Sequence, residues 1–269
     1  MTRIAVNGAA GRMGRTVIET ATDHEDCEVV VGVDVDAEPV DEVPVVTPEE
    51  TASALLEHEP QVGIDFSVPD ASLAFADACA EAGVALVVGT TGFDDEGLAA
   101  IREASEAVPV LKATNFSRGI QALLGAVREA TGALPGADVE LVETHHNRKR
   151  DAPSGTAKTI VETVQEQRDL EPTYGREGEA PREEEEIGVF ARRAGGIHGE
   201  HELLLAGEHE ALTLTHRAES RGVFAAGALD AATWLAGREP GWYEFADVVG
   251  EGDVVNEERE DDQERGDRR

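Results

Sequence analysis

Short apolar runs and longer amphipathic segments alternate over the first half of the chain. The apolar runs have the length of buried strands, and they occupy residues 3–7, 28–33, 62–66, 85–88 and 110–113. Helix-like segments lie between them, near residues 17–24, 49–58, 71–82 and 94–107. Strands that alternate with helices are typical of a doubly wound parallel sheet. The pattern therefore predicts an α/β fold for this half.

The second half of the chain has a different order of elements. Two helices are expected near residues 120–130 and 156–167, and strands at 139–145, 188–193, 201–206 and 211–216. Successive strands with short connections favour an antiparallel or mixed sheet, so we expect a second α+β domain. Residues 171–186 are charged and rich in Gly and Pro, which predicts a loop. A last helix is expected from about residue 222 to residue 235.

Charge changes this picture at the surface. The 269 residues contain 56 acidic and 23 basic side chains, a net charge of −33, and only three of the basic residues are lysines. Such a surface disfavours nucleic acid and anionic membranes as partners. Dense charge also suggests disorder, but the apolar runs are too regular for it before residue 251. We expect a folded protein adapted to high salt, with 251–269 as an acidic, flexible tail.

The location expected from the sequence is the cytoplasm. No stretch approaches eighteen apolar residues, and the N-terminus enters a strand without a basic leader. Cys27 and Cys79 are too few for a disulfide framework and lack the spacing of a zinc site.

Three glycines lie at the first strand-to-helix turn. Gly8, Gly11 and Gly14 stand where backbone N–H groups and a helix N-terminus can hold a pyrophosphate. The cofactor-binding positions predicted in this turn are Gly8, Ala9, Ala10, Gly11, Arg12 and Met13. Glycines in a tight turn without a ligand are the alternative, but an acidic Asp34 ends the next strand, where it would accept hydrogen bonds from a ribose. Because no Lys or Arg lies between residues 16 and 101, we expect NADH to be preferred and NADPH to be possible.

Two further segments follow strands of the predicted sheet. Residues 89–93 follow the strand at 85–88, and residues 113–116 follow the strand at 110–113. Open α/β sheets bind ligands at the carboxyl ends of their strands, although both segments could be plain turns. The residues expected to contact the cofactor are Gly89, Thr90, Thr91, Ala113, Thr114, Asn115 and Phe116.

The segment from Glu143 to Thr156 carries the most informative chemistry. It holds two histidines, His145 and His146, and three consecutive cations at 148–150, a positive island in an acidic chain. A small polyanion is its natural ligand, although a solvated basic loop is the alternative. Ser154, Gly155 and Thr156 then open a helix whose free amides can take a carboxylate.

A metal site is not expected in this segment, because adjacent histidines on a strand point to opposite faces. The remaining histidines, His198, His201, His209 and His216, are scattered over strands and turns. We interpret them as structural or surface residues.

At these positions the chain resembles the dihydrodipicolinate reductases of lysine biosynthesis. The resemblance covers about residues 1–250 and rests on GAAGRMG (8–14), GTTGFD (89–94), ATNFS (113–117), ETHHNRKRDAPSGTA (143–157), RAGGIHGEH (193–201) and HRAESR (216–221). It implies hydride transfer from NAD(P)H to a cyclic imine. It also implies that His145 donates or accepts a proton, that Lys149 donates one or contacts a carboxylate, and that His146 and Ser154–Thr156 bind substrate.

The family resemblance also implies the domain organisation. It assigns 1–117 and 222–250 to a Rossmann-like dinucleotide-binding domain and 118–221 to a substrate-binding and oligomerisation domain, with copies associating as a homotetramer. Asn147 and Arg148 depart from the expected motif. One alternative stays open from another class, a regulatory module that senses NAD without catalysis. It predicts no acid, base or anion-binding cluster facing the cofactor.

Overall fold

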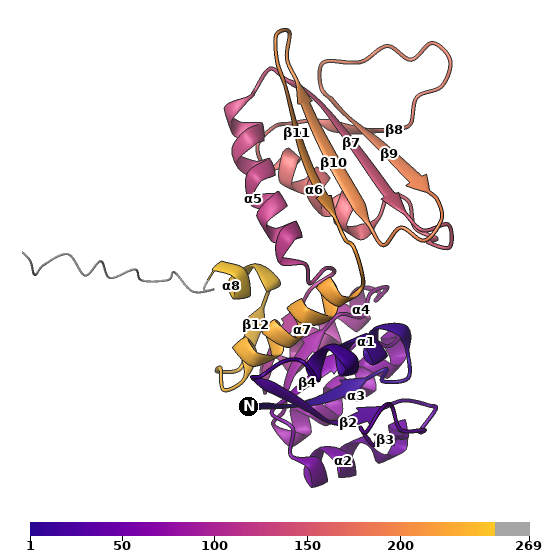
Figure 1. Ribbon diagram of the computed structural model, residues 1–269. Coiled ribbons are helices and arrows are strands. Elements are labelled where there is room, and N and C mark those ends of the chain that lie inside the picture. Colours follow the sequence, from indigo (N-terminus) through magenta and orange to yellow (C-terminus); the bar gives the residue numbers. More distant parts are fainter. Residues whose placement is uncertain (251–269) are drawn as a thin grey trace, which may run out of the picture.

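The chain forms two units, each built on its own β-sheet (Figure 1). The computed structural model describes residues 1–250. The predicted acidic tail, 251–269, lies outside the described residues. In that described part, no helix is both long and apolar enough to cross a membrane.

The first unit contains a seven-stranded sheet in which every strand pair is parallel. Across the sheet the strands are β12 (Gly241–Tyr243), β6 (Pro109–Lys112), β5 (Ala85–Val88), β4 (Val62–Asp65), β1 (Thr2–Asn7), β2 (Cys27–Val33) and β3 (Val45–Val46). The helices of this unit are α1 (Arg12–Ala21), η1 (Pro48–Glu50), α2 (Thr51–His58), α3 (Pro69–Ala82), α4 (Asp95–Ala104), α7 (Gly222–Leu235) and α8 (Phe245–Gly250). This arrangement confirms the predicted doubly wound α/β class.

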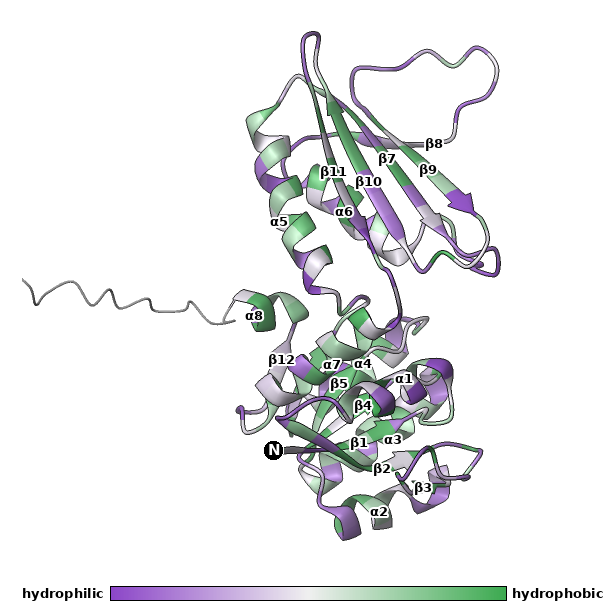
Figure 2. Cartoon of the chain, viewed as in Figure 1, coloured by the Kyte–Doolittle hydropathy of each residue, from purple (hydrophilic) through white to green (hydrophobic). Residues whose placement is uncertain are grey.

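Helices cover both faces of this sheet, which explains why its strands are apolar at successive positions. Ile4 and Val6 of β1 pack with α1 and α7, whereas Ala5 packs on the opposite face with α2 and α3. Figure 2 shows the result as central strands dominated by hydrophobic colour, with hydrophilic residues on the outer sides of the helices.

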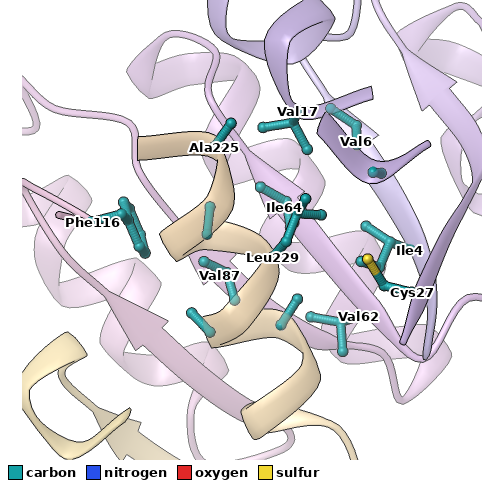
Figure 3. Packing of buried hydrophobic residues seen from close by; sticks show 14 of the residues in the cluster. Ile4, Val6, Val17, Cys27, Val62, Ile64, Val87, Phe116, Ala225 and Leu229 are labelled. Carbon is teal, nitrogen blue, oxygen red and sulfur yellow. The ribbon is translucent and has the colours of Figure 1, made fainter. Parts of the chain in front are cut away.

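Helix α7 returns to the first sheet after the second unit is complete. Ala225 and Leu229 of α7 belong to one hydrophobic cluster with Ile64 and Val87 of the sheet, and Leu229 lies beside Ile64 (Figure 3). A Cβ atom on Gly227 would lie 1.8 Å from the carbonyl oxygen of Phe116. A glycine is therefore required here, because the helix lies directly against the backbone that follows β6.

The second unit contains a mixed five-stranded sheet, as the sequence predicts. Its strands are β11 (Ala211–Arg217), β10 (Glu200–Ala206), β7 (Asp138–His145), β9 (Glu186–Arg193) and β8 (Glu171–Tyr174), in that order. Strands β7, β8 and β9 are parallel, while β10 pairs antiparallel with β7 and β11. Helices α5 (Arg118–Ala133) and α6 (Gly155–Gln165) pack on one face, around Leu141, Ile160 and Leu203.

The predicted loop at 171–186 is wrong at both ends. Its first four residues form the edge strand β8, and Glu186 begins β9. Glu-Pro-Thr-Tyr has no apolar alternation, and an edge strand can form without it because one side needs no ladder partner.

The chain passes between the units twice. It leaves the first sheet between β6 and α5 and returns between β11 and α7. Ser117, which caps α5, lies 3.1 Å from His216 Nε2 near the end of β11. One hydrogen bond thus joins the two crossings to each other.

Candidate active site

A cavity of about 410 Å³ lies between the two units. From the first unit, its walls include Met13, Gly89 and Thr91 and the segment Thr114–Phe116. From the second unit, its walls are His145, His146, Lys149, Asp151, Ser154, Gly155, Thr156 and His198. Segments that the sequence places more than 100 residues apart therefore face one space.

His145 lies at the end of β7 and is held from behind by a carboxylate. Its Nδ1 is 2.6 Å from Glu143 Oε2. Burial opposes ionisation of Glu143, but hydrogen bonds from His145 and Arg193 outweigh it and lower the pKa of this carboxyl to about 2. An ionised carboxylate can only accept, so Nδ1 of His145 carries the proton. The catalytically available nitrogen is Nε2.

The N-terminus of α6 forms the floor of the cavity on the substrate side. The Ser154 hydroxyl accepts a hydrogen bond from Ala157 N–H, so Ser154 caps α6 as predicted. The same hydroxyl lies 3.2 Å from His201 Nε2. Burial lowers the pKa of His201 to about 3, so a neutral ring shares this hydrogen bond with Ser154. The helix start is therefore fixed by its own cap and by a neighbouring strand.

Lys149 and His146 supply the polar groups of the connecting loop. Lys149 Nζ lies 2.9 Å from Asp151 Oδ1. Burial raises the pKa of Asp151, but the hydrogen bond and the positive charge of Lys149 outweigh it, so this pKa is lowered. Burial and the nearby cations Arg148 and Arg221 lower the pKa of His146. The lowered pKa favours a neutral His146, which can contact an anion by hydrogen bonding without adding a further cation to the loop.

The glycine turn has the close backbone approaches that a dinucleotide site needs. Gly8 has φ +78°, and a Cβ there would lie 2.5 Å from Phe66 O. A Cβ on Gly14 would lie 2.1 Å from Gly8 O. The N-cap of α1, Gly11, offers no side-chain cap, which leaves the first-turn N–H groups for a phosphate. The residues present therefore fit a pyrophosphate.

Asp34, which follows β2, contacts this turn. One of its carboxylate oxygens accepts from Ala10 N–H at 2.9 Å, and the other lies 3.3 Å from Asp36 N. Asp34 therefore stabilises the turn and still has lone pairs for a ribose. Arg15 donates to the Ala10 carbonyl oxygen at 2.9 Å.

A buried polar network supports the edge of the sheet beside the cavity. Asp65 is fully buried and accepts hydrogen bonds from Asn7 at 2.8 Å and from Ser67 and Ser72 at 2.5 Å each. Ser67 N–H in turn donates to the hydroxyl of Thr90. Thr90 is thus a structural contact of this edge rather than a wall of the cavity.

The structure separates the predicted cofactor residues into two groups. Met13, Gly89, Thr91, Thr114, Asn115 and Phe116 line the cavity with all six predicted catalytic and substrate residues. Gly8, Ala9, Ala10, Gly11, Arg12, Asp34, Thr90 and Ala113 are outside its lining. Most of the second group surround the glycine turn, where the two ends of an extended dinucleotide could be held separately.

Comparison with known proteins shows the family of the chain. Family models for the N-terminus and the C-terminus of dihydrodipicolinate reductase match residues 2–116 and 119–249. The chain belongs to the dihydrodipicolinate reductase family. The two models meet at the crossing that precedes α5.

Individual members of the dihydrodipicolinate reductase family match almost the full chain. The 4-hydroxy-tetrahydrodipicolinate reductase of Haloarcula marismortui is 64% identical over 93% of this chain and 99% of its own length. That of Natronomonas pharaonis is 55% identical over 91% and 99%. A dipicolinate-bound dihydrodipicolinate reductase from Paenisporosarcina sp. TG-14 superposes with a TM-score of 0.75, at 26% identity, over 91% of this chain and 97% of that one.

Several residues of this dihydrodipicolinate reductase site were not singled out from the sequence. Phe66, Phe224 and His198 line the cavity, and Glu143 and Arg193 lie behind it. Of the histidines interpreted as structural or surface residues, His198 is partly exposed and lines the cavity, whereas His201 is buried. Glu143 did leave a signal, since it shares the inward face of β7 with Val139, Leu141 and His145.

Proposed function

We propose that this chain reduces the cyclic imine derived from 4-hydroxy-tetrahydrodipicolinate, giving tetrahydrodipicolinate. The observation that carries the proposal is the single cavity that joins the cofactor edge of a parallel sheet to His145, Lys149 and the N-terminus of α6. When bound, NAD(P)H supplies the hydride. The chain itself must bind a dicarboxylate, orient it and handle a proton.

Substrate binding is assigned to the start of α6. Backbone N–H groups of Gly155 and Thr156 point from a helix N-terminus, where a carboxylate is stabilised. The Thr156 hydroxyl accepts from Asn115 Nδ2 at 2.9 Å, so its own proton remains to be donated. Because Asn115 follows β6, this contact also links the substrate site to the cofactor edge. The dipicolinate in the solved relative supports a small dicarboxylate as the ligand.

Proton handling is assigned to His145 and Lys149. Glu143 fixes the proton of His145 on Nδ1, and Nε2 exchanges a proton with the reacting molecule. Lys149 is held by Asp151 and contributes a positive charge or a proton toward the substrate. These are the acid, base and anion-binding groups that a sensor without catalysis would not need.

NADH is proposed as the preferred cofactor, with NADPH possible. Asp34 lies at the end of β2, where its charge would repel a 2′-phosphate. Of the two cations near the turn, Arg12 and Arg15, the Arg15 side chain already donates to the Ala10 carbonyl oxygen. The charge of Asp34 and this contact of Arg15 support NADH.

The remaining proposals concern the environment of the enzyme. We propose that the protein is a cytoplasmic homotetramer that needs high salt. Within each copy, we propose that residues 1–117 and 222–250 form the dinucleotide-binding domain and residues 118–221 the substrate-binding and oligomerisation domain. The helices α5 and α6 cover only one face of the five-stranded sheet (Figure 1). On the other face Val142 and Phe190 are register partners and half-buried, which supports this face as the surface where copies associate.

The test follows NADH oxidation optically, with and without freshly generated substrate. We expect substrate-dependent oxidation and competitive inhibition by dipicolinate. The matched control is the His145→Ala variant with its NADH affinity measured separately. Binding of NADH without substrate-dependent oxidation in the wild-type chain would favour the sensor and overturn the enzyme assignment.

A further inference from the structure

We propose that Glu143 is a positioning residue that fixes the ring of His145 with Nδ1 turned inward and Nε2 left for proton transfer. The proposal rests on the proposed function, because it takes His145 as the proton-handling residue. Neither residue composition nor the predicted sites assigned Glu143 a role. Its position in the fold does.

The Glu143 carboxylate is fully buried and uses both oxygens. Oε2 accepts from His145 Nδ1 at 2.6 Å and from Arg193 at 2.8 Å. Oε1 accepts from Ser154 N–H at 3.0 Å and from Arg193 at 2.7 Å. One side chain therefore joins the histidine at the end of β7, the capped start of α6 and an arginine of β9.

Arg193 compensates the free-energy cost of burying the Glu143 carboxylate. A buried carboxylate without a cation is strongly disfavoured, and Arg193 provides two parallel hydrogen bonds to it. Arg193 is itself fixed by the backbone oxygens of Asp151 and Arg192. The pair has no net charge, so His145 can gain and lose a proton beside it.

On the Nε2 side of the His145 ring, the neighbouring residue is a glycine. A Cβ on Gly199 would lie 3.1 Å from His145 Nε2, which is tighter than ordinary contact. The His201 ring packs edge-on against His145 at a centroid distance of 5.3 Å. Glu143 holds one nitrogen, His201 limits rotation, and Gly199 leaves room at the other nitrogen.

A pH experiment must account for every charged or titratable group around His145. They are Glu143 on β7, Arg193 on β9, His201 on β10, and His146, Lys149, Asp151 and His198 in the loops. The Glu143→Gln and Arg193→Gln variants change this environment in opposite directions. Removing the anion disfavours a protonated histidine, and removing the cation favours it.

The decisive measurement is the pH profile of kcat/KM in the full-length enzyme. For Glu143→Gln we expect a fall of about 10²-fold in kcat, little change in KM, and a high-pH limb that moves about one unit lower. For Arg193→Gln we expect the same limb to move higher. A purely structural role would lower the activity of both variants without opposite displacements of the profile.

The matched control is Glu140→Gln. Glu140 lies on the same strand, also binds arginines, and points to the other face of the sheet. We expect an unchanged pH profile, compared at equal oligomeric state by size exclusion. If Glu143→Gln does not fold, the shift of the high-pH limb in Arg193→Gln alone tests the positioning role.

The two proposals fail in different ways. Absence of substrate-dependent NADH oxidation in the wild-type chain overturns the proposed function. Wild-type activity in His145→Ala leaves the function standing and overturns the role of His145, and the positioning role of Glu143 with it. Low activity in His145→Ala together with a wild-type profile in Glu143→Gln and Arg193→Gln overturns only the positioning role. A further loss when Glu143→Gln is added to His145→Ala would also contradict it, since a residue that acts through His145 has nothing left to position.

Discussion

The two walls of the cavity, each taken together with the residues that support it, are built by different means. The first wall adjoins the glycine turn through Met13, and in that turn Gly8 and Gly14 allow close backbone approach while the α1 N-terminus has no side-chain cap. The second wall consists of polar side chains that fix one another, with His145 lining the cavity and Glu143 and Arg193 behind it. The first wall can bind and align, while the second can also move protons. Changes in the first wall should therefore affect affinity, and changes in the second should affect turnover.

The largest effect is expected from the second wall. His145→Ala should lower kcat by about 10²–10⁴-fold, because it removes a general acid and leaves the helix N-terminus intact. Lys149→Ala should lower kcat and also raise KM for the dicarboxylate, because it removes a cation from the anion site. Steady-state kinetics at saturating NADH separate the two. Near-wild-type turnover in either variant would contradict its assignment.

A backbone change in the first wall should give the opposite signature. Gly8→Ala is expected to raise KM for NADH about tenfold, because its φ is positive and the new Cβ meets Phe66 O. Gly83→Ala is the matched control, since Gly83 has φ +69° but no atom within 4 Å of a Cβ. Both variants should melt at lower temperature, but only Gly8→Ala should change KM. Equal KM values for the two would mean that the turn does not bind the cofactor.

A smaller effect is expected on the choice between NADH and NADPH. The wild-type enzyme should have a higher kcat/KM with NADH than with NADPH, and Asp34→Asn should narrow that ratio several-fold by removing a charge near the 2′-position. The two cofactors are compared in parallel kinetics. Equal or better efficiency of the wild-type with NADPH would show the preference to be wrong.

The smallest effect at the site itself is expected from salt. Salt screens repulsion among the 56 carboxylates over long distances, whereas the contacts of Lys149 and α6 act at short range in a partly desolvated cavity. The Debye length falls from about 30 Å at 0.01 M to about 3 Å at 1 M salt. Melting temperature and activity should rise together toward molar KCl, while KM for the dicarboxylate rises only modestly. A flat or falling melting temperature at fixed protein concentration would reject the adaptation to high salt.

The sequence predicted the first unit well because its strands are buried on both faces. Ala85–Val88 is a continuous apolar run, and Val62–Asp65 is apolar up to its final aspartate; polar segments begin where both end, so both the strands and the ligand edge could be located. Strands β3, β8 and β12 are short and lie near or at sheet edges, where little burial is needed. Their residues therefore show no clear hydrophobic pattern from which a strand could be predicted.

The site was predictable where its residues are neighbours in sequence. Residues 143–156 form one segment, and the Ser154 cap follows from local rules alone. Arg193 and His198 reach the site only through the pairing of β7 with β9 and β10, which spacing along the chain does not reveal. The same holds for Asp65, whose partner Asn7 comes from a separate strand.

The hydrogen bond between Ser117 and His216 limits how the two units can move. Two bodies joined by independent linkers can rotate, slide and twist. Here the outgoing and returning segments are joined by Ser117 and His216, and Asn115 and Arg118 make further contacts between the units, so we expect relative motion to be mainly a rotation about the two adjacent crossings. A rotation of this kind would open and close the cavity between the units. We expect each closure to return His145 to the same position relative to residues 113–116, so that the hinge as well as the walls determines alignment.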